Sequence, residues 1–181
     1  MKQNHISGPK GDTIIKVSLI LVLLLSALNL QAQTPIVYSG KWEFDKTRSD
    51  KDETGDYSFD GIIILEIKQD AATISFANTF KRPGKADFVI EPDSFFLDGR
   101  VTTDNGGTGP AKKFVKWSPD KKILTTSYVM TDKIDGVAQD FTTANSYKLS
   151  DDGKTLTIEE LHKSKLNGEN KIKKVYKKVI K

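Results

Sequence analysis

Short segments rich in β-branched and aromatic residues recur through most of this chain, and turn sequences separate them. In the first segment, Trp42 and Phe44 alternate with charged residues, so one face is apolar and the other, which includes Asp45, is charged. Beyond residue 33, no stretch keeps the apolar spacing of an amphipathic helix. This alternation predicts an all-β fold.

The expected strands span residues 41–45, 62–68, 72–78, 86–90, 95–97, 114–117, 123–130, 137–149, 155–161 and 171–179. A glycine-rich loop is expected at residues 102–110. Turn pairs such as Asn167 and Gly168 join neighbouring segments tightly, which favours an antiparallel meander of eight to ten strands. Because closing such a sheet removes its exposed edges, we predict a barrel or half-barrel, with a β-sandwich as the alternative.

The amino terminus has the composition of a cleavable export signal. Residues 17–30 are almost continuously apolar, three lysines precede them, and small or polar residues follow. These 14 residues are fewer than the roughly 20 that a membrane span needs. We expect cleavage near Ala32 or Gln33, which removes residues 1–33 and leaves one domain, residues 34–181, without a stable membrane span. The predicted location is periplasmic or secreted.

Charge and cysteine content narrow the classes of function. The chain has no cysteine, which excludes disulfides and lipid attachment through a cysteine. Without residues 1–33 it has 25 basic and 23 acidic residues and is nearly neutral. A nearly neutral exported domain is a poor candidate for nucleic-acid binding. No cofactor and no particular protein partner is predicted.

Short motifs near both ends of the domain are shared with a known group of proteins. In order, they are Gly40 and Trp42 (a G-x-W motif), Ser49, Asp50, the run at 149–158, Val175, Tyr176 and Lys178. Through these motifs the chain resembles exported bacterial lipocalin-like, or calycin-type, β-barrel proteins of mostly unassigned function. The resemblance implies a non-enzymatic barrel that binds a small apolar or amphipathic ligand.

The interior of a small barrel is either filled by side chains or left open for a ligand. The residues predicted to face this interior and to contact a ligand are Trp42, Phe76, Tyr128, Phe141, Asn145 and Tyr147. Polar members such as Asn145 need hydrogen-bond partners, which favours a wet or ligand-holding interior.

His162, the only histidine after residue 33, lies on the same strand face as Glu160, an arrangement that a general base could use. The sequence shows no motif that identifies a nucleophile near these two residues. No second histidine and no cysteine follows residue 33 to complete a transition-metal site. We therefore expect a partly exposed polar pair and no catalytic residues.

An acidic segment follows the first strand. Asp50, Asp52 and Asp56 have the spacing of a calcium-binding loop, but Gly61 stands where the bidentate glutamate is required. A solvated loop is the favoured interpretation, with a weak calcium site as the alternative.

The last expected strand is strongly basic, with six lysines in residues 171–181. Because these lysines are interleaved with apolar residues, we expect an edge strand whose solvent-facing side keeps it soluble. In the alternative function, the chain is a structural or accessory protein that acts through its outer surface. This strand or the glycine-rich loop would then bind a protein or an anionic partner in the cell envelope.

Overall fold

The computed structural model describes residues 35–51, 59–104, 110–134 and 137–180. In these ranges the chain is all-β, with eleven strands in one antiparallel sheet and no helix. The predicted fold class is therefore confirmed, and the two separate sheets of a sandwich are not present among the described residues. No helix of the described part has the length and apolar character needed to cross a membrane.

The strands follow one another with short connections. They are β1 (Gly40–Phe44), β2 (Ile62–Gln69), β3 (Thr73–Lys81), β4 (Phe88–Val89), β5 (Asp93–Phe96), β6 (Thr102–Asp104), β7 (Ala111–Trp117), β8 (Ile123–Ile134), β9 (Val137–Leu149), β10 (Thr155–Ser164) and β11 (Gly168–Lys178). The count exceeds eight to ten because β6 forms inside the segment expected to be a loop. Its β-branched residues Thr102 and Thr103 pair with β7 before the glycines begin.

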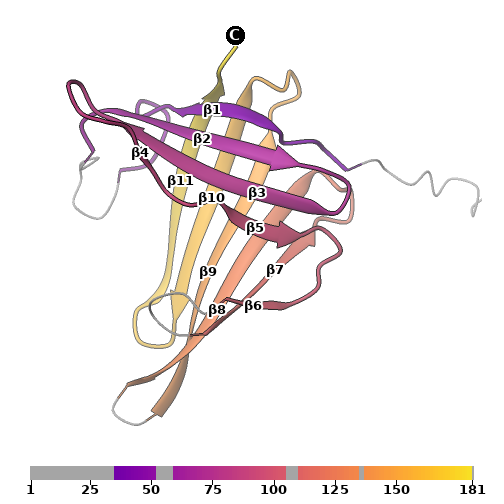
Figure 1. Ribbon diagram of the computed structural model, residues 1–181. Helices are drawn as coiled ribbons and strands as arrows, with labels where there is room; N and C mark the ends of the chain where they lie inside the picture. Colours follow the sequence, from indigo (N-terminus) through magenta and orange to yellow (C-terminus); the bar gives the residue numbers. More distant parts are fainter. Residues whose placement is uncertain (1–34, 52–58, 105–109, 135–136, 181) are drawn as a thin grey trace, which may run out of the picture. The chain divides into compact units, whose positions relative to one another are not determined.

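The spatial order of the strands is β4-β3-β2-β1-β11-β10-β9-β8-β7-β6, with β5 also paired to β3 (Figure 1). Strands consecutive in sequence are thus neighbours in the sheet, except where the chain passes from β4 to β5 and from β5 to β6. No strand pairing joins β5 to β7 among the described residues, so the sheet stays open and forms a half-barrel. Side chains bridge this opening, since Lys113 Nζ lies 2.8 Å from Asp93 Oδ1 and the rings of Phe95 and Tyr128 are 5.5 Å apart.

The first and last strands lie beside each other. β1 pairs with β2 on one side and with β11 on the other, and β10 occupies the second edge of β11. The expectation that β11 is an edge strand is therefore wrong. Alternating lysines show which side of a strand faces water, but they do not report whether its backbone edges are occupied.

Several motif residues meet at this junction. Gly40 has φ of 148°, a conformation that strains residues with a Cβ. Beyond β1, the Ser49 hydroxyl accepts the Val175 amide at 2.8 Å and Asp50 Oδ2 accepts the Lys173 amide at 2.8 Å. These contacts tie the two ends of the domain together, so the short motifs have a clear role in building the sheet.

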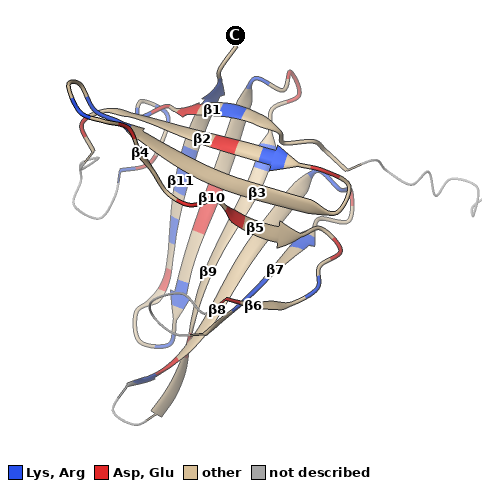
Figure 2. Cartoon of the chain, in the orientation of Figure 1, with Lys and Arg blue, Asp and Glu red and all other residues tan. Residues whose placement is uncertain are grey.

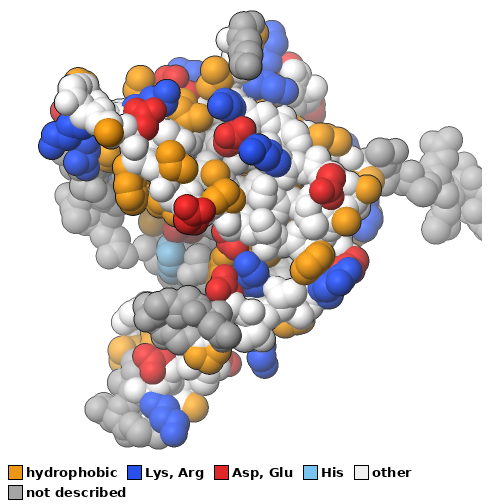
Figure 3. Space-filling view, viewed as in Figure 1, with side chains coloured by type: hydrophobic (Ala, Val, Ile, Leu, Met, Phe, Trp, Pro, Cys, Tyr) orange, Lys and Arg blue, Asp and Glu red, His pale blue; other side chains and the backbone are white. Residues whose placement is uncertain are grey.

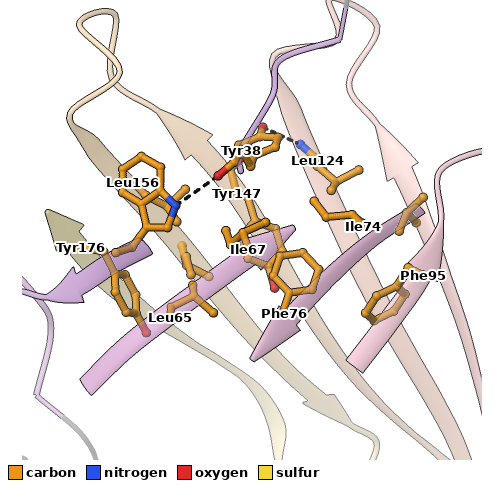
Figure 4. Close-up of a cluster of buried hydrophobic side chains, with 13 residues drawn as sticks. Tyr38, Leu65, Ile67, Ile74, Phe76, Phe95, Leu124, Tyr147, Leu156 and Tyr176 are labelled. Carbon is orange, nitrogen blue, oxygen red and sulfur yellow. Dashed lines mark hydrogen bonds between the residues drawn. The ribbon is translucent and has the colours of Figure 1, made fainter. Parts of the chain in front are cut away.

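The core is organised around Tyr38 and Trp42, which have no exposed surface. The Trp42 indole donates to the Tyr38 carbonyl at 3.1 Å. The Tyr38 hydroxyl accepts the Leu124 amide at 3.2 Å (Figure 4). It donates to the Tyr147 carbonyl at 2.7 Å, and the Lys122 carbonyl lies 2.9 Å away. The segment before β1 therefore joins β8 and β9 across the interior. Burial raises the pKa of Tyr38 to about 12, more than the Leu124 hydrogen bond lowers it.

Asp45 departs from the sequence expectation. It was expected on the charged, solvent-facing side of the first strand, but its side chain is buried. The strand ends at Phe44, and the following turn directs Asp45 towards Thr47, Arg48 and Lys177, whose donors lie 2.6, 2.7 and 2.9 Å from its carboxylate. Because Lys177 belongs to β11, this carboxylate also fixes the β1–β11 junction.

Replacing Tyr38 with Phe is expected to destabilise the fold by about 1–3 kcal/mol, because the change leaves the Leu124 amide and a carbonyl without a buried partner. The free energy of unfolding can be measured by urea denaturation. Tyr128→Phe is the matched control, since its hydroxyl makes no hydrogen bond among the described residues. Equal losses in both variants would show that the Tyr38 hydroxyl has no special role.

Replacing Asp45 with Asn is expected to give a pH-dependent loss of stability. The hydrogen bond from Thr47, then the contact with Lys177, hold the pKa of Asp45 far below its usual range, although burial opposes them. This stabilisation is present above the unfolded-state pKa of about 4 and is lost as the pH falls towards the folded-state value. The difference between wild type and Asp45→Asn should therefore be large at neutral pH and shrink in acid. The exposed turn residue Asp151, changed to Asn, provides the control, and a pH-independent difference would contradict this account.

Candidate functional site

A cavity of about 210 Å³ lies against the inner face of the sheet. Its apolar and aromatic lining comes from Leu65, Phe76, Ile90, Phe95, Tyr128, Tyr147, Ile158 and Tyr176. Its polar lining comes from Asn78, Glu91, Asp93, Thr126, Asn145, Glu160 and Lys174. The half-barrel therefore brings residues from β2 to β11 around one space that is half apolar and half polar.

Aromatic rings form one wall of the cavity. The rings of Phe76 and Tyr147 are stacked, with centroids 4.6 Å apart and planes inclined by 20°. Phe95 meets Phe76 edge-on at 6.0 Å (Figure 4). Burial raises the pKa of Tyr147 and of Tyr176 far above the ordinary value, so both phenols stay protonated. This aromatic wall therefore carries no charge at neutral pH.

An ion pair lies beside the aromatic wall. Glu160 Oε2 contacts Lys174 Nζ from the neighbouring strand, and Glu160 Oε1 lies 2.6 Å from His162 Nε2. Burial works against ionisation of Glu160, but Lys174 and, to a smaller extent, His162 outweigh it and lower the pKa of the carboxyl group. The cavity thus has a fixed carboxylate whose positive partner comes from the protein itself.

Asn145 has an unmet hydrogen-bonding group. Its side-chain carbonyl oxygen is buried and has no hydrogen-bond partner among the described residues. A buried acceptor without a partner is costly, and native proteins normally satisfy such atoms with a protein group, water or ligand. Asn145 lines the cavity beside Thr126 and Tyr147, so the oxygen that lacks a partner belongs to a residue of the cavity wall.

The residues predicted to contact a ligand divide into two groups. Phe76, Tyr128, Asn145 and Tyr147 line the cavity. Trp42 does not, because its ring is packed in the core next to Tyr38. Whether any of these residues binds a ligand remains a prediction.

Phe141, the remaining predicted residue, lies further along β9. It lines a separate recess of about 520 Å³ together with His162. It shares a strand face with Asn145 and Tyr147, but four residues of extended chain carry it past the end of the cavity.

Sequence reasoning missed Glu160, Lys174 and Tyr176 as parts of this site. Lys174 was counted among the solvent-facing lysines, yet it lies between Ile172 and Tyr176 on the same face of β11. A lysine at an apolar position of a strand was the available signal. Its partner Glu160 was not identifiable without the β10–β11 register.

The predicted pairing of Glu160 with His162 is confirmed as a contact. The Thr143 hydroxyl lies 3.4 Å from His162 Nδ1, beyond the 2.6–3.2 Å reach expected for a nucleophile and its base. Among the described residues, no cluster of three or more His, Cys, Asp or Glu side chains has an arrangement that would hold a metal ion. The described residues therefore offer no positive sign of catalysis.

The calcium-loop residues are placed only in part. Asp50 directs one oxygen to the Lys173 amide and lies 4.0 Å from the Lys173 ammonium group. Asp52 and Asp56, like glycine-rich residues 105–109, lie outside the described residues. Among the described residues of this segment, Asp50 is therefore bound to the backbone of β11.

The basic final strand is largely neutralised within the protein. Lys171 Nζ lies 3.0 Å from Glu169 Oε1, Lys177 pairs with Asp45, and Lys174 pairs with Glu160. Lys178 Nζ lies 5.4 Å from the centre of the Trp42 ring. These lysines therefore stabilise the sheet and do not form a free basic surface.

Comparison with known proteins found no matching family model and no matching curated protein. The resemblance to lipocalin-like proteins stays a prediction from the short motifs.

The Glu160–Lys174 pair can be tested by a double-mutant cycle. Lys174→Met should cost about 1–3 kcal/mol of unfolding free energy, because it leaves a half-buried carboxylate without its cation. Adding Glu160→Gln should restore part of this loss. The exposed pair of Glu169 and Lys171 is the control, with an expected coupling much smaller than that of Glu160 and Lys174 in the same urea titrations. Equal coupling in both pairs would contradict a special environment in the cavity.

Proposed function

We propose that this chain is an exported, non-enzymatic, lipocalin-like protein that binds a small molecule in the cavity. The ligand has an apolar, preferably aromatic, body and a head group that donates hydrogen bonds. The observation that carries the proposal is the buried side-chain oxygen of Asn145, which has no hydrogen-bond partner among the described residues and belongs to the wall of a partly aromatic cavity. A donor from the ligand would satisfy this atom.

The cavity volume limits the size of the ligand. A cavity of about 150 Å³ already accepts benzene, whereas sites for drug-sized molecules measure about 300–1,000 Å³. At about 210 Å³, this cavity suits a single aromatic ring with a short substituent. The stacked pair of Phe76 and Tyr147 offers such a ring a flat surface.

The polar lining favours a donor head group over an acceptor. Glu91, Asp93, Glu160 and Asn145 supply acceptor oxygens. The only cation in the lining, Lys174, is already paired with Glu160. Asp93 is paired with Lys113, so Glu91 is the one carboxylate of the lining without an ion pair among the described residues. A carboxylate ligand would meet these acceptor oxygens unfavourably, whereas an amine or alcohol would donate hydrogen bonds to them.

Export is supported by the apolar segment at residues 17–30, and the lipocalin-like assignment by the motifs at the two ends of the domain. These motif residues lie together at the β1–β11 junction, which a closed or nearly closed β-sheet needs. A ligand-binding role agrees with all of these features.

Binding can be tested with three probes that share one aromatic ring. Calorimetric titration of the purified chain should show the tightest binding for benzylamine, weaker binding for benzyl alcohol and the weakest for benzoate. Asn145→Leu should weaken benzylamine binding by about tenfold, because it removes the acceptor. Asn167→Leu, in the exposed β10–β11 turn, should leave the affinity unchanged. No binding of any probe at millimolar concentration, or a preference for benzoate, would refute the proposal.

A further inference from the structure

The connection from β3 to β5 exposes large apolar side chains. Residues 81–92 are exposed without interruption, and this stretch includes Phe88, Val89 and Ile90, with exposed fractions of 65, 55 and 45%. β4 pairs with β3 on one side and forms one end of the strand order, so neither its outer edge nor these side chains are covered by another described strand. Soluble proteins rarely expose such a continuous apolar group without a partner.

Basic residues lie directly beside this apolar group. Lys81, Arg82 and Lys85 fall within five residues at the turn that follows β3, and Gly84, with φ of 69°, allows that turn to be tight. Figure 2 shows this blue turn at the outer end of β3, and Figure 3 shows basic atoms beside hydrophobic ones there. We call Phe59 together with residues 80–90 the β3–β4 tip.

The charges at the β3–β4 tip are not fully neutralised. Lys81 lies 3.6 Å from Asp87, which balances one lysine. Arg82 instead lies over the Phe59 ring, with its guanidinium carbon 4.8 Å from the ring centre. Lys85 has no ion pair among the described residues. Within the described ranges, Arg82 and Lys85 thus have no carboxylate partner, and both lie next to the exposed apolar residues.

The β3–β4 tip adjoins the cavity. A recess of about 330 Å³ is lined by Phe59, Phe80, Arg82, Lys85, Phe88 and Ile90 among others. Ile90 also lines the cavity described above. Whatever covers the tip therefore also lies at the rim of the cavity.

We propose that the β3–β4 tip docks on an anionic lipid bilayer. Exposed aromatic and aliphatic side chains enter the boundary between head groups and acyl chains, while neighbouring arginine and lysine bind lipid phosphates. A turn with a two-residue strand is narrow, which suits insertion among head groups better than the broad patch that a stable protein interface needs. Docking goes beyond the proposed ligand binding and does not depend on it.

Docking can be measured by co-sedimentation of the purified chain with lipid vesicles. We expect binding to vesicles of phosphatidylcholine with added phosphatidylglycerol, and much less to phosphatidylcholine alone. Arg82→Glu with Lys85→Glu should weaken binding by at least about tenfold, because each basic residue near a charged surface contributes about fivefold. Phe88→Ser with Val89→Ser should weaken it as well. All four side chains are exposed, so thermal unfolding of these variants should match wild type.

The control reverses two charges elsewhere. Lys112→Glu with Lys116→Glu makes the same net-charge change on exposed positions of β7 and should leave binding intact. In a second measurement, Phe88→Trp should give blue-shifted tryptophan emission when anionic vesicles are added.

Three results would overturn the proposal. The first is no sedimentation with anionic vesicles, and the second is an equal loss in the Lys112 and Lys116 variant, which would indicate diffuse charge attraction. The third is a dimer in light scattering that Phe88→Ser with Val89→Ser dissociates, since the apolar residues would then bind a second copy of the chain. Failure of the benzylamine titration alone would leave docking unaffected.

Discussion

The pairing of β1 with β11 is the constraint on which the rest of this structure depends. Without it, β1 to β5 and β6 to β11 would be two separate meanders, each with an exposed edge at the junction. The pairing is reinforced from outside the strands, because Ser49 and Asp50 continue along the edge of β11 and the Asp45 carboxylate holds Lys177. The two meanders can then share one interior, which Tyr38 and Trp42 fill at one end.

Away from Tyr38 and Trp42, the apolar core leaves a cavity, which is the candidate site. Lys174 and Glu160 are adjacent in this space because β11 and β10 are neighbours, and their mutual contact keeps both charges in partly buried positions. The side-chain carbonyl oxygen of Asn145, by contrast, has no hydrogen-bond partner among the described residues. The same inner face thus contains a satisfied polar pair and an unsatisfied acceptor, and the difference between them points to the ligand chemistry proposed above.

Much of the fold was predictable from local patterns, and the site only in part. The alternation in residues 137–149 gave the bounds of β9, and the Asn167–Gly168 turn correctly joined β10 to β11. Along β9 the same alternation identified Asn145 and Tyr147 as inward-facing. It also selected Phe141, which faces inward but lies beyond the cavity. The period-two alternation shows which face of the sheet a side chain lies on. Its position along the barrel axis depends instead on the register between strands.

The amino-acid sequence by itself determined the all-β class, most hairpins and the face on which most apolar residues lie, because these depend on interactions within a few residues of the chain. The tertiary structure decided that β11 lies inside the sheet, that Asp45 is buried and that Lys174 meets Glu160. Each of these three features depends on contacts between strands. Which strands are neighbours, and in which register they pair, is set by the curvature of the whole sheet. The burial of a charged group depends on whether such a partner reaches it, which a linear pattern does not contain.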